Sequence, residues 1–212
     1  MKIVVFGASG RMGIKVVERA LEAGHNVTAF LRTPSKIAIQ HPKLTLFQGD
    51  VMDAAAVGNA IAEQEVVISV LGPKRPPVPD MTSMMETAAK NIVAAMQKHG
   101  IRRIISTTGA TVPQPEDQPK VGDRLIVAIL NILEKGFVLD ASANVKVIQT
   151  SNLDWTIVRF PRVMDGARTG KYRVAYLGKD SGTQISRADG ADFVLKELTE
   201  KKWLRQAPVV SY

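Results

Sequence analysis

The stretch Met1–Gly13, MKIVVFGASGRMG, decides the fold predicted for this chain. The apolar, β-branched run from Lys2 to Phe6 predicts a buried strand. Three glycines follow with the spacing GxxGxxG: Gly7 permits a tight turn, Gly10 leaves room for a pyrophosphate, and Gly13 lets a helix pack closely on the strand. The N–H groups of the first helical turn then face an anion. The stretch predicts a dinucleotide-binding turn; the alternative is a tight turn that binds nothing.

Beyond this turn, predicted strands and helices alternate along the chain. We expect strands over residues 26–31, 44–47, 66–71, 101–107 and 155–159, helices over 11–24, 54–63, 81 or 82–99 and 189–199, two helical pieces over 125–133 and 140–150 broken near Gly136, and short strands over 172–177 and 208–211. This order predicts an α/β fold, a Rossmann-type doubly wound parallel sheet in three α/β/α layers. We expect a single domain, residues 1–212, with small substrate-side elements over residues 160–212.

The composition narrows the function classes. The chain has 212 residues and no cysteine, which excludes disulfides and thiolate chemistry. The formal charge is +8, but aromatics are only 5% and the basic residues are scattered, which disfavours a nucleic-acid partner and fits a surface that attracts a polyanionic cofactor. No metal-ligand cluster is apparent in the sequence. The start does not resemble a signal peptide, and no apolar stretch reaches the ~20 residues of a membrane span, so we expect a cytoplasmic protein.

The end of the second predicted strand indicates which nicotinamide cofactor is preferred. An acidic residue there hydrogen-bonds the adenosine ribose, whereas a basic one accommodates a 2′-phosphate. Arg32 holds this position, Ser35 and Lys36 follow, and Arg11 in the glycine turn is near enough to help. The pattern predicts NADP as cofactor, with NADPH preferred over NADH. The alternative is that Arg32 is an ordinary solvated arginine.

The remaining cofactor contacts are expected at the carboxyl ends of the strands, where open α/β sheets bind ligands. Asp50 follows the third strand and is expected to accept from the adenine amino group beside the Val51 backbone, unless it serves only as a turn-maker or helix cap. The full set of expected cofactor-binding residues is Gly7, Ser9, Gly10, Arg11, Met12, Gly13, Arg32, Ser35, Lys36, Asp50, Val51, Val70, Leu71, Gly72, Thr107 and Pro161.

Hydroxyl groups end the fifth predicted strand, at Ser106, Thr107 and Thr108. Tyr172 and Tyr176 lack a lysine four residues on, so the sequence offers no Tyr-x-x-x-Lys acid. The candidate catalytic residues are Thr108, as hydrogen-bond partner of the nicotinamide or acceptor carbonyl, Ser106, which is less favoured, and Arg162, which is expected to orient the acceptor. The alternative for Arg162 is a side chain that points to solvent after Pro161.

Several stretches together resemble one family of proteins. They are IVVFGASGRMG, VTAFLRTPSK, FQGDVMDAAAV, VISVLGP, KNIVAAMQKHGIRRIISTTGA, SNLDWTIVRFPRVMDGARTGKYRV and QISRADGADFVL. The chain resembles an atypical short-chain dehydrogenase/reductase, within the NAD(P)H-binding group that includes biliverdin reductase B/flavin reductase and the NmrA-like proteins. The resemblance implies an NADPH-dependent reductase that passes hydride directly to a planar conjugated acceptor such as a flavin, a linear tetrapyrrole or a quinone. The competing implication is a non-enzymatic NmrA-like redox sensor.

Two departures from the flavin/biliverdin reductase pattern concern the acceptor end. Gly109 stands where that family has a serine, and Arg162 stands where it has a histidine. An apparent insertion at residues 124–139 contains the apolar segment Leu125–Leu133, which we interpret as a lid or a homodimer face. An apolar slot for the acceptor is expected between two sets of residues, Pro73, Pro76 and Pro77 on one side and Phe160, Pro161 and Met164 on the other.

Overall fold

A computed structural model describes residues 1–72, 83–122, 124–125, 128 and 135–212. One sheet has the strand order β3-β2-β1-β4-β5-β6-β10-β8, and its pairs are parallel except β10 with β8. Its strands are β1 Lys2–Phe6, β2 Asn26–Leu31, β3 Leu44–Gln48, β4 Val66–Ser69, β5 Arg103–Gly109, β6 Asp154–Phe160, β8 Arg173–Ala175 and β10 Val209–Ser211. A second, two-stranded parallel sheet pairs β7 Arg162–Met164 with β9 Gln184–Ser186.

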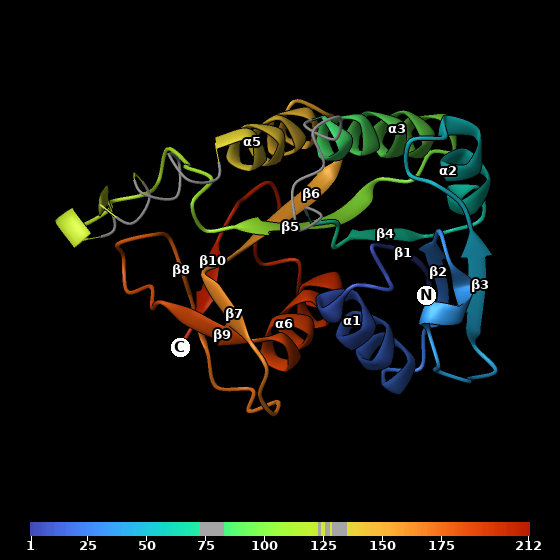
Figure 1. Ribbon diagram of the computed structural model, residues 1–212, viewed down its shortest axis with the longest axis horizontal. Coiled ribbons are helices and arrows are strands. Elements are labelled where there is room, and N and C mark those ends of the chain that lie inside the picture. Colours follow the sequence, from blue (N-terminus) through green and yellow to red (C-terminus); the bar gives the residue numbers. More distant parts are fainter. Residues whose placement is uncertain (73–82, 123, 126–127, 129–134) are drawn as a thin grey trace.

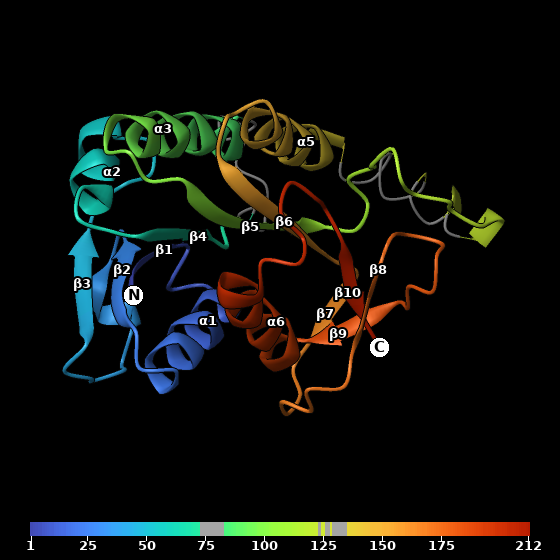
Figure 2. The ribbon, with the colours of Figure 1, turned by 180° about the vertical axis from the view of Figure 1, so that it is seen from behind.

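Helices cover both faces of the large sheet, as Figures 1 and 2 show from opposite sides. The helices are α1 Arg11–Glu22, α2 Ala54–Ile61, α3 Met84–Lys98, α5 Lys135–Gln149 and α6 Arg187–Glu200, with a short 3₁₀ helix η1 over Pro34–Lys36. On one face α1 packs against α6, and on the other α2, α3 and α5 form a row. Each face has its own apolar core. The predicted Rossmann-type three-layer fold is confirmed.

The strand order reverses between β1 and β4. From β1 the chain moves outward through β2 and β3, and it then returns to β4 on the other side of β1 before continuing to β5 and β6. In an open parallel sheet, such a switch point leaves a crevice outside the carboxyl ends of the strands, because the connections on its two sides lead to opposite faces. The glycine turn that follows β1 lies at this crevice, so the topology itself selects where a ligand can bind.

Several boundaries differ from the sequence predictions. The helix α5 begins at Lys135 and runs through Gly136, where a break was predicted; a glycine in the first turn disturbs few intrahelical hydrogen bonds. The strands β7 and β9 were not predicted, because three residues are too few to show an alternating pattern. The first turn of the predicted helix over 81 or 82–99 and most of the segment Leu125–Leu133 lie outside the described residues, as do Pro73, Pro76 and Pro77.

A buried ion pair fixes the loop that leaves the carboxyl end of β5. The guanidinium of Arg159 on β6 is fully buried and donates to both carboxylate oxygens of Asp117, at 2.7 and 2.8 Å. It also donates to the carbonyl oxygens of Val112 and Ala207. Because each buried donor has a partner, the pair avoids the cost of an isolated buried charge and ties residues 112–117 to β6. The loop that follows β5 is therefore held by hydrogen bonds to β6.

None of the helices in the described residues combines the length and the apolar character that crossing a membrane requires.

Candidate functional site

The glycine turn brings two stretches of backbone into direct contact. Gly7 has φ +81°, and a Cβ there would lie 2.7 Å from the carbonyl oxygen of Val70. A Cβ on Gly13 would collide with the backbone of Gly7 and Ala8, so α1 packs on the turn more closely than any side chain allows. A Cβ on Gly10 meets only the Gly7 carbonyl oxygen, at 3.2 Å. Gly7 and Gly13 are thus needed by the fold, whereas Gly10 mainly keeps space free in front of the helix.

The helix α1 begins without a side-chain cap. Gly10 is its N-cap, with extended backbone angles, and offers no side chain to the first turn. The first N–H groups of an α-helix have no intrahelical partner, and the helix dipole is positive at this end. The turn therefore presents backbone donors to the crevice, which is the arrangement that holds a phosphate or pyrophosphate.

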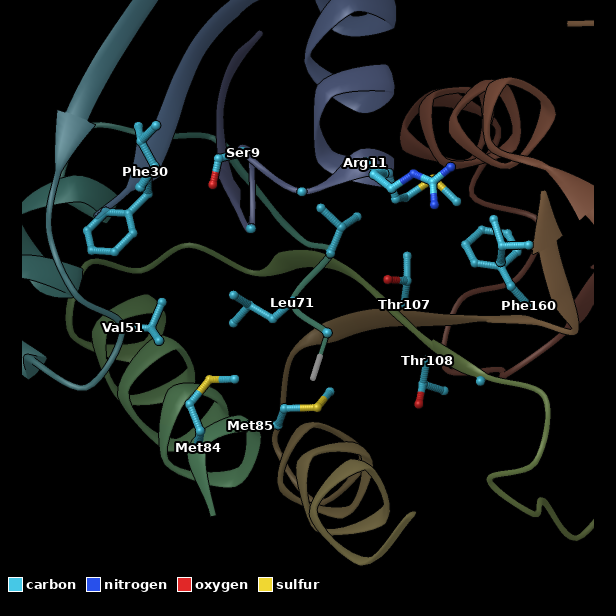
Figure 3. A pocket seen from close by; sticks show the side chains of 18 of the residues that line it. Ser9, Arg11, Phe30, Val51, Leu71, Met84, Met85, Thr107, Thr108 and Phe160 are labelled. Atoms are coloured by element: carbon cyan, nitrogen blue, oxygen red, sulfur yellow. The ribbon is translucent and has the colours of Figure 1, made fainter. Parts of the chain in front are cut away.

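A cavity of about 860 Å³ runs along the carboxyl ends of the strands (Figure 3). Most of the predicted cofactor-binding residues line it together: Gly7, Ser9, Gly10, Arg11, Met12, Arg32, Asp50, Val51, Val70, Leu71, Gly72, Thr107 and Pro161. The predicted catalytic residue Thr108 also lines it. Residues from the ends of six strands, β1 to β6, and from α1 thus converge on one space, as the switch-point topology requires.

One end of the cavity lies beside β2 and β3. Arg32 is exposed there, and no carboxylate among the described residues forms an ion pair with its side chain. Asp50 accepts from the Met52 N–H at 3.0 Å, so its carboxylate also makes the turn that was left open as its alternative role. The Asn91 side chain on α3 donates to the Val51 carbonyl oxygen at 2.9 Å and holds this loop in place. This end offers one cation and one carboxylate to a ligand.

Three predicted cofactor residues do not line the cavity. Gly13 is packed against the turn, which is its structural role. Ser35 and Lys36 are exposed on η1, which follows Arg32 in the chain. Because both lie on the surface next to the Arg32 end, they are placed to meet only a group that projects out of the cavity.

Two of the predicted catalytic residues, Ser106 and Arg162, also do not line the cavity. Ser106 is 2% exposed, pairs in register with Ser69 of β4, and does not reach the cavity. Arg162 is exposed on β7, and its neighbours Pro161 and Val163 line the cavity while Arg162 does not. Strand alternation explains this, because successive side chains point to opposite faces. The exposure of Arg162 outside the cavity lining agrees with the solvent-exposed alternative, and its role toward an acceptor stays a prediction.

Near the end of β5, the side chains of Thr107 and Thr108 point to opposite sides of the strand, as Figure 3 shows. Thr107 is directed toward Arg11, and Thr108 toward the side on which Met85 lies. The Thr108 hydroxyl oxygen is buried and has no hydrogen-bond partner among the described residues. Buried polar atoms are nearly always paired in folded proteins, so this hydroxyl is a candidate for a partner outside the described residues.

The wall around Thr108 is apolar. Most of the residues that form this wall or continue it were missed by sequence reasoning. Together with Leu71, the cavity is lined by Met84 and Met85 from α3, Phe137 from α5, and Phe160 and Val163 from the β6–β7 region. Only Phe160 was expected, whereas Met164 does not line the cavity. Periodicity assigned the methionines to the helix that starts near them, and nothing in the sequence distinguishes a cavity-facing methionine from one in the core.

Arg187 is the charged residue that sequence reasoning missed. It opens α6, lines the cavity, and donates to the Asp165 carboxylate at 2.6 Å. Arg11 donates to the other oxygen of the same carboxylate. Arg187 and Asp165 both fall in stretches that carried the family resemblance, but they are far apart in sequence from each other and from Arg11. Proximity of this kind is visible only after folding.

A tyrosine–lysine pair does form, but away from the cavity. Tyr172 donates to Asp192 at 3.0 Å, and the Lys196 ammonium lies 5.2 Å from the centre of the Tyr172 ring. The pKa of Tyr172 is raised to about 12, mainly because the side chain is buried. Neither Tyr172 nor Lys196 lines the cavity. The pair ties residue 172 to α6.

No group of three or more His, Cys, Asp or Glu side chains in the described part of the chain is arranged to hold a metal ion.

Comparison with protein families gives a match over most of the chain. The model of a family described as NAD(P)H-binding matches residues 7–201. The chain belongs to this NAD(P)H-binding family. The match begins at Gly7 of the glycine turn and extends through α6, so it includes both walls of the cavity.

The relatives span several activities. The uncharacterized protein YwnB of Bacillus subtilis is 27% identical over 216 residues, which cover 93% of this chain and 92% of YwnB. A 3-beta-hydroxysteroid dehydrogenase of Mycolicibacterium neoaurum is 31% identical over 120 residues, or 52% of this chain and 32% of the dehydrogenase. The chain thus spans about a third of that relative's length, and the match to it is confined to a shared part.

Solved structures show the same fold. A short-chain dehydrogenase/reductase from Veillonella parvula in complex with NADP superposes with a TM-score of 0.77 at 21% identity, covering 100% of this chain and 94% of that one. ChuY, an anaerobillin reductase from Escherichia coli O157:H7, superposes with a TM-score of 0.80 at 22% identity, covering 100% and 97%. At these identities the likeness establishes the architecture, which agrees with the sheet order and the layers described above.

The glycine turn generates a direct test. In Gly10→Val the backbone angles of residue 10 remain accessible to valine, but the added side chain fills the space in front of α1. We expect a folded protein that no longer binds NADPH or NADH, measured by fluorescence titration. The control is Gly58→Val, because a Cβ at Gly58 on α2 meets nothing within 4 Å. Tight binding by folded Gly10→Val would show that the turn has only a structural role.

Proposed function

We propose that the chain is an NADPH-dependent oxidoreductase that transfers hydride to a planar conjugated acceptor, such as a flavin, a quinone or a linear tetrapyrrole. The main observation behind the proposal is that Arg32, the glycine turn and Thr108 line one cavity, and that the Thr108 hydroxyl has no hydrogen-bond partner among the described residues. Membership of the NAD(P)H-binding family supports the cofactor, and the reductase among the structural neighbours is in keeping with the reaction class.

The residues present fit a dinucleotide. The uncapped start of α1 and the open space at Gly10 suit the pyrophosphate, and the loop at Asp50 and Val51 suits the adenine. Arg32 suits a 2′-phosphate, because its planar guanidinium donates to phosphate oxygens and has no competing ion pair among the described residues. When bound, the reduced nicotinamide supplies a hydride.

The acceptor end fits a flat, largely apolar molecule. Leu71, Met85 and Phe160 present apolar surface there, and Thr108 presents one hydroxyl. The charged side chains that line the described cavity are Arg11, Arg32, Asp50 and Arg187, and the single acid among them lies at the Arg32 end. Since this leaves no titratable proton donor beside Thr108, solvent supplies the proton. Thr108 then donates a hydrogen bond to the carbonyl that gains charge as hydride arrives.

The alternative of a non-enzymatic NmrA-like sensor shares the glycine turn and the Arg32 end. The unpaired Thr108 hydroxyl inside an apolar wall favours the enzyme, because a protein that only reports the dinucleotide has no need of a second, acceptor-shaped space. The predicted homodimer face at Leu125–Leu133 lies largely outside the described residues, and the cytoplasmic location stays a prediction.

Turnover tests the proposal directly. We expect the purified protein to oxidise NADPH in the presence of a panel of flavins and quinones, followed by the loss of nicotinamide absorbance. The folded Gly10→Val variant serves as the inactive control. NADPH that binds tightly but is oxidised with none of these acceptors would contradict the reductase proposal and favour the sensor.

The cofactor preference is tested at Arg32. Arg32→Ala is expected to weaken NADPH binding by about 1.5–3 kcal/mol, the scale of a charge-assisted hydrogen bond, and to leave NADH binding nearly unchanged. Calorimetric titration with both cofactors measures the difference. Arg102→Ala removes the same charge at the opposite edge of the sheet and is the matched control. An equal loss for NADPH and NADH would refute the assignment of Arg32 to the 2′-phosphate.

Thr108→Val separates stability from turnover. Valine has nearly the shape of threonine and removes a buried hydroxyl that has no hydrogen-bond partner among the described residues, so the free energy of unfolding is expected to rise by about 1 kcal/mol. Turnover is expected to fall by at most ~10²-fold, because the hydroxyl assists but does not supply the proton. Urea unfolding and steady-state kinetics measure the two effects. Complete loss of activity in a folded variant would show that Thr108 is an essential acid.

A further inference from the structure

Two arginines share one carboxylate at the acceptor end of the cavity. Arg11 opens α1 and Arg187 opens α6, and both line the cavity. Each donates to a different oxygen of Asp165, which follows β7. Three segments that are remote in sequence therefore meet at one anionic group.

The exposure of the three side chains differs sharply. The Arg187 side chain is 13% exposed, whereas those of Arg11 and Asp165 are 71% and 72% exposed. Desolvation raises the pKa of the Asp165 carboxyl, but the hydrogen bonds and charges of Arg187 and Arg11 outweigh it, so the pKa is lowered and the group is ionised at neutral pH. The cluster retains one net positive charge, and its carboxylate is as accessible to water as Arg11 and far more accessible than Arg187. Water-exposed ion pairs are weak and exchange readily.

The position of the pair relates it to the acceptor. Figure 3 shows Arg11 directed away from Phe30 and toward Thr107 and Phe160. A Cβ on Gly190 of α6 would lie 3.0 Å from Met12 and 3.2 Å from Phe160, which places the start of α6 against this same corner. Arg32 lies at the opposite end, beside β2.

We propose that Arg11 and Arg187 form the binding seat for an anionic group of the acceptor, a carboxylate or a phosphate, and that Asp165 occupies the seat until the ligand replaces it. This inference rests on the proposed function and adds a substrate class to it. A guanidinium pair already arranged around a carboxylate receives another planar or tetrahedral oxyanion with the same donors. The acceptor is thus a conjugated ring system that carries an acidic substituent.

Flavin mononucleotide and riboflavin are the probes, because they share one ring system and differ by a phosphate. Binding of each to the protein loaded with NADP⁺ is measured by fluorescence, without turnover. We expect the wild-type protein to bind flavin mononucleotide roughly tenfold or more tightly than riboflavin, the scale of a charge-assisted hydrogen bond. Arg187→Gln is expected to bring this ratio close to one.

Asp165→Asn is expected to change the preference for flavin mononucleotide in the opposite direction from Arg187→Gln. Removal of the resident carboxylate leaves the two arginines without their partner, so the preference for flavin mononucleotide is expected to increase severalfold. Arg168→Gln is the charge control: this arginine lies in the same loop and outside the cavity lining, and its ion-pair partners are 3.8 Å away. It is expected to leave the ratio unchanged.

The outcomes separate this proposal from the proposed function. Equal affinity of the two flavins, or binding of neither, overturns the anion seat. A loss of NADP⁺ affinity in Arg187→Gln with an unchanged flavin ratio also overturns it and assigns the pair to the pyrophosphate of the cofactor. A strong preference for flavin mononucleotide that depends on Arg187, without oxidation of NADPH by any acceptor, supports the seat and contradicts the reductase.

Discussion

The contact of backbone with backbone at Gly7 and Gly13 is the constraint on which the rest of the structure depends. The carbonyl of Val70 approaches Gly7 within the space that a Cβ would fill, and α1 rests on the turn at Gly13 with no side chain between them. These two contacts set the start of α1 directly above the switch between β1 and β4. The helix start, the ends of the strands β1 to β6 and the crevice then share one edge, and every candidate ligand contact follows from that placement.

Features coded by neighbouring residues were predictable from the sequence. The glycine spacing, the buried strands and Arg32 at the end of β2 are local patterns, and the predicted α/β layers and the residues around the turn, including Thr108, are found where expected. The assignment of Arg162 did not rest on a local pattern of this kind. The position after Pro161 was assigned to the acceptor by analogy with a histidine, whereas the side-chain direction on β7 excludes it from the cavity lining.

Features that depend on distant residues were not predictable. The pair of Arg11 and Arg187 joins residues near opposite ends of the chain. The contact of Tyr172 with Lys196 joins residues 24 positions apart, which no Tyr-x-x-x-Lys search finds. The burial of Arg159 with Asp117 is another such case, because a charged residue within a predicted strand gives no sign of its partner. Single-sequence patterns report periodicity and spacing, and only the folded chain shows which charges meet.

The arginines at the two ends of the cavity differ in whether they have an ion-pair partner. Beside Arg32 the cation has no ion-pair partner among the described residues and is open to water, so a phosphate that binds there displaces only solvent. Arg11, toward which Thr107 is directed, is already paired with Asp165 together with Arg187, whereas Thr108 on the opposite side of β5 has a buried hydroxyl with no hydrogen-bond partner among the described residues. Satisfying a buried hydroxyl gains more than satisfying a hydrated one, because the unbound state carries its desolvation cost already. In the proposed function the apolar wall and Thr108 therefore hold the acceptor ring, while in the proposed anion seat the two arginines discriminate among acceptors by charge.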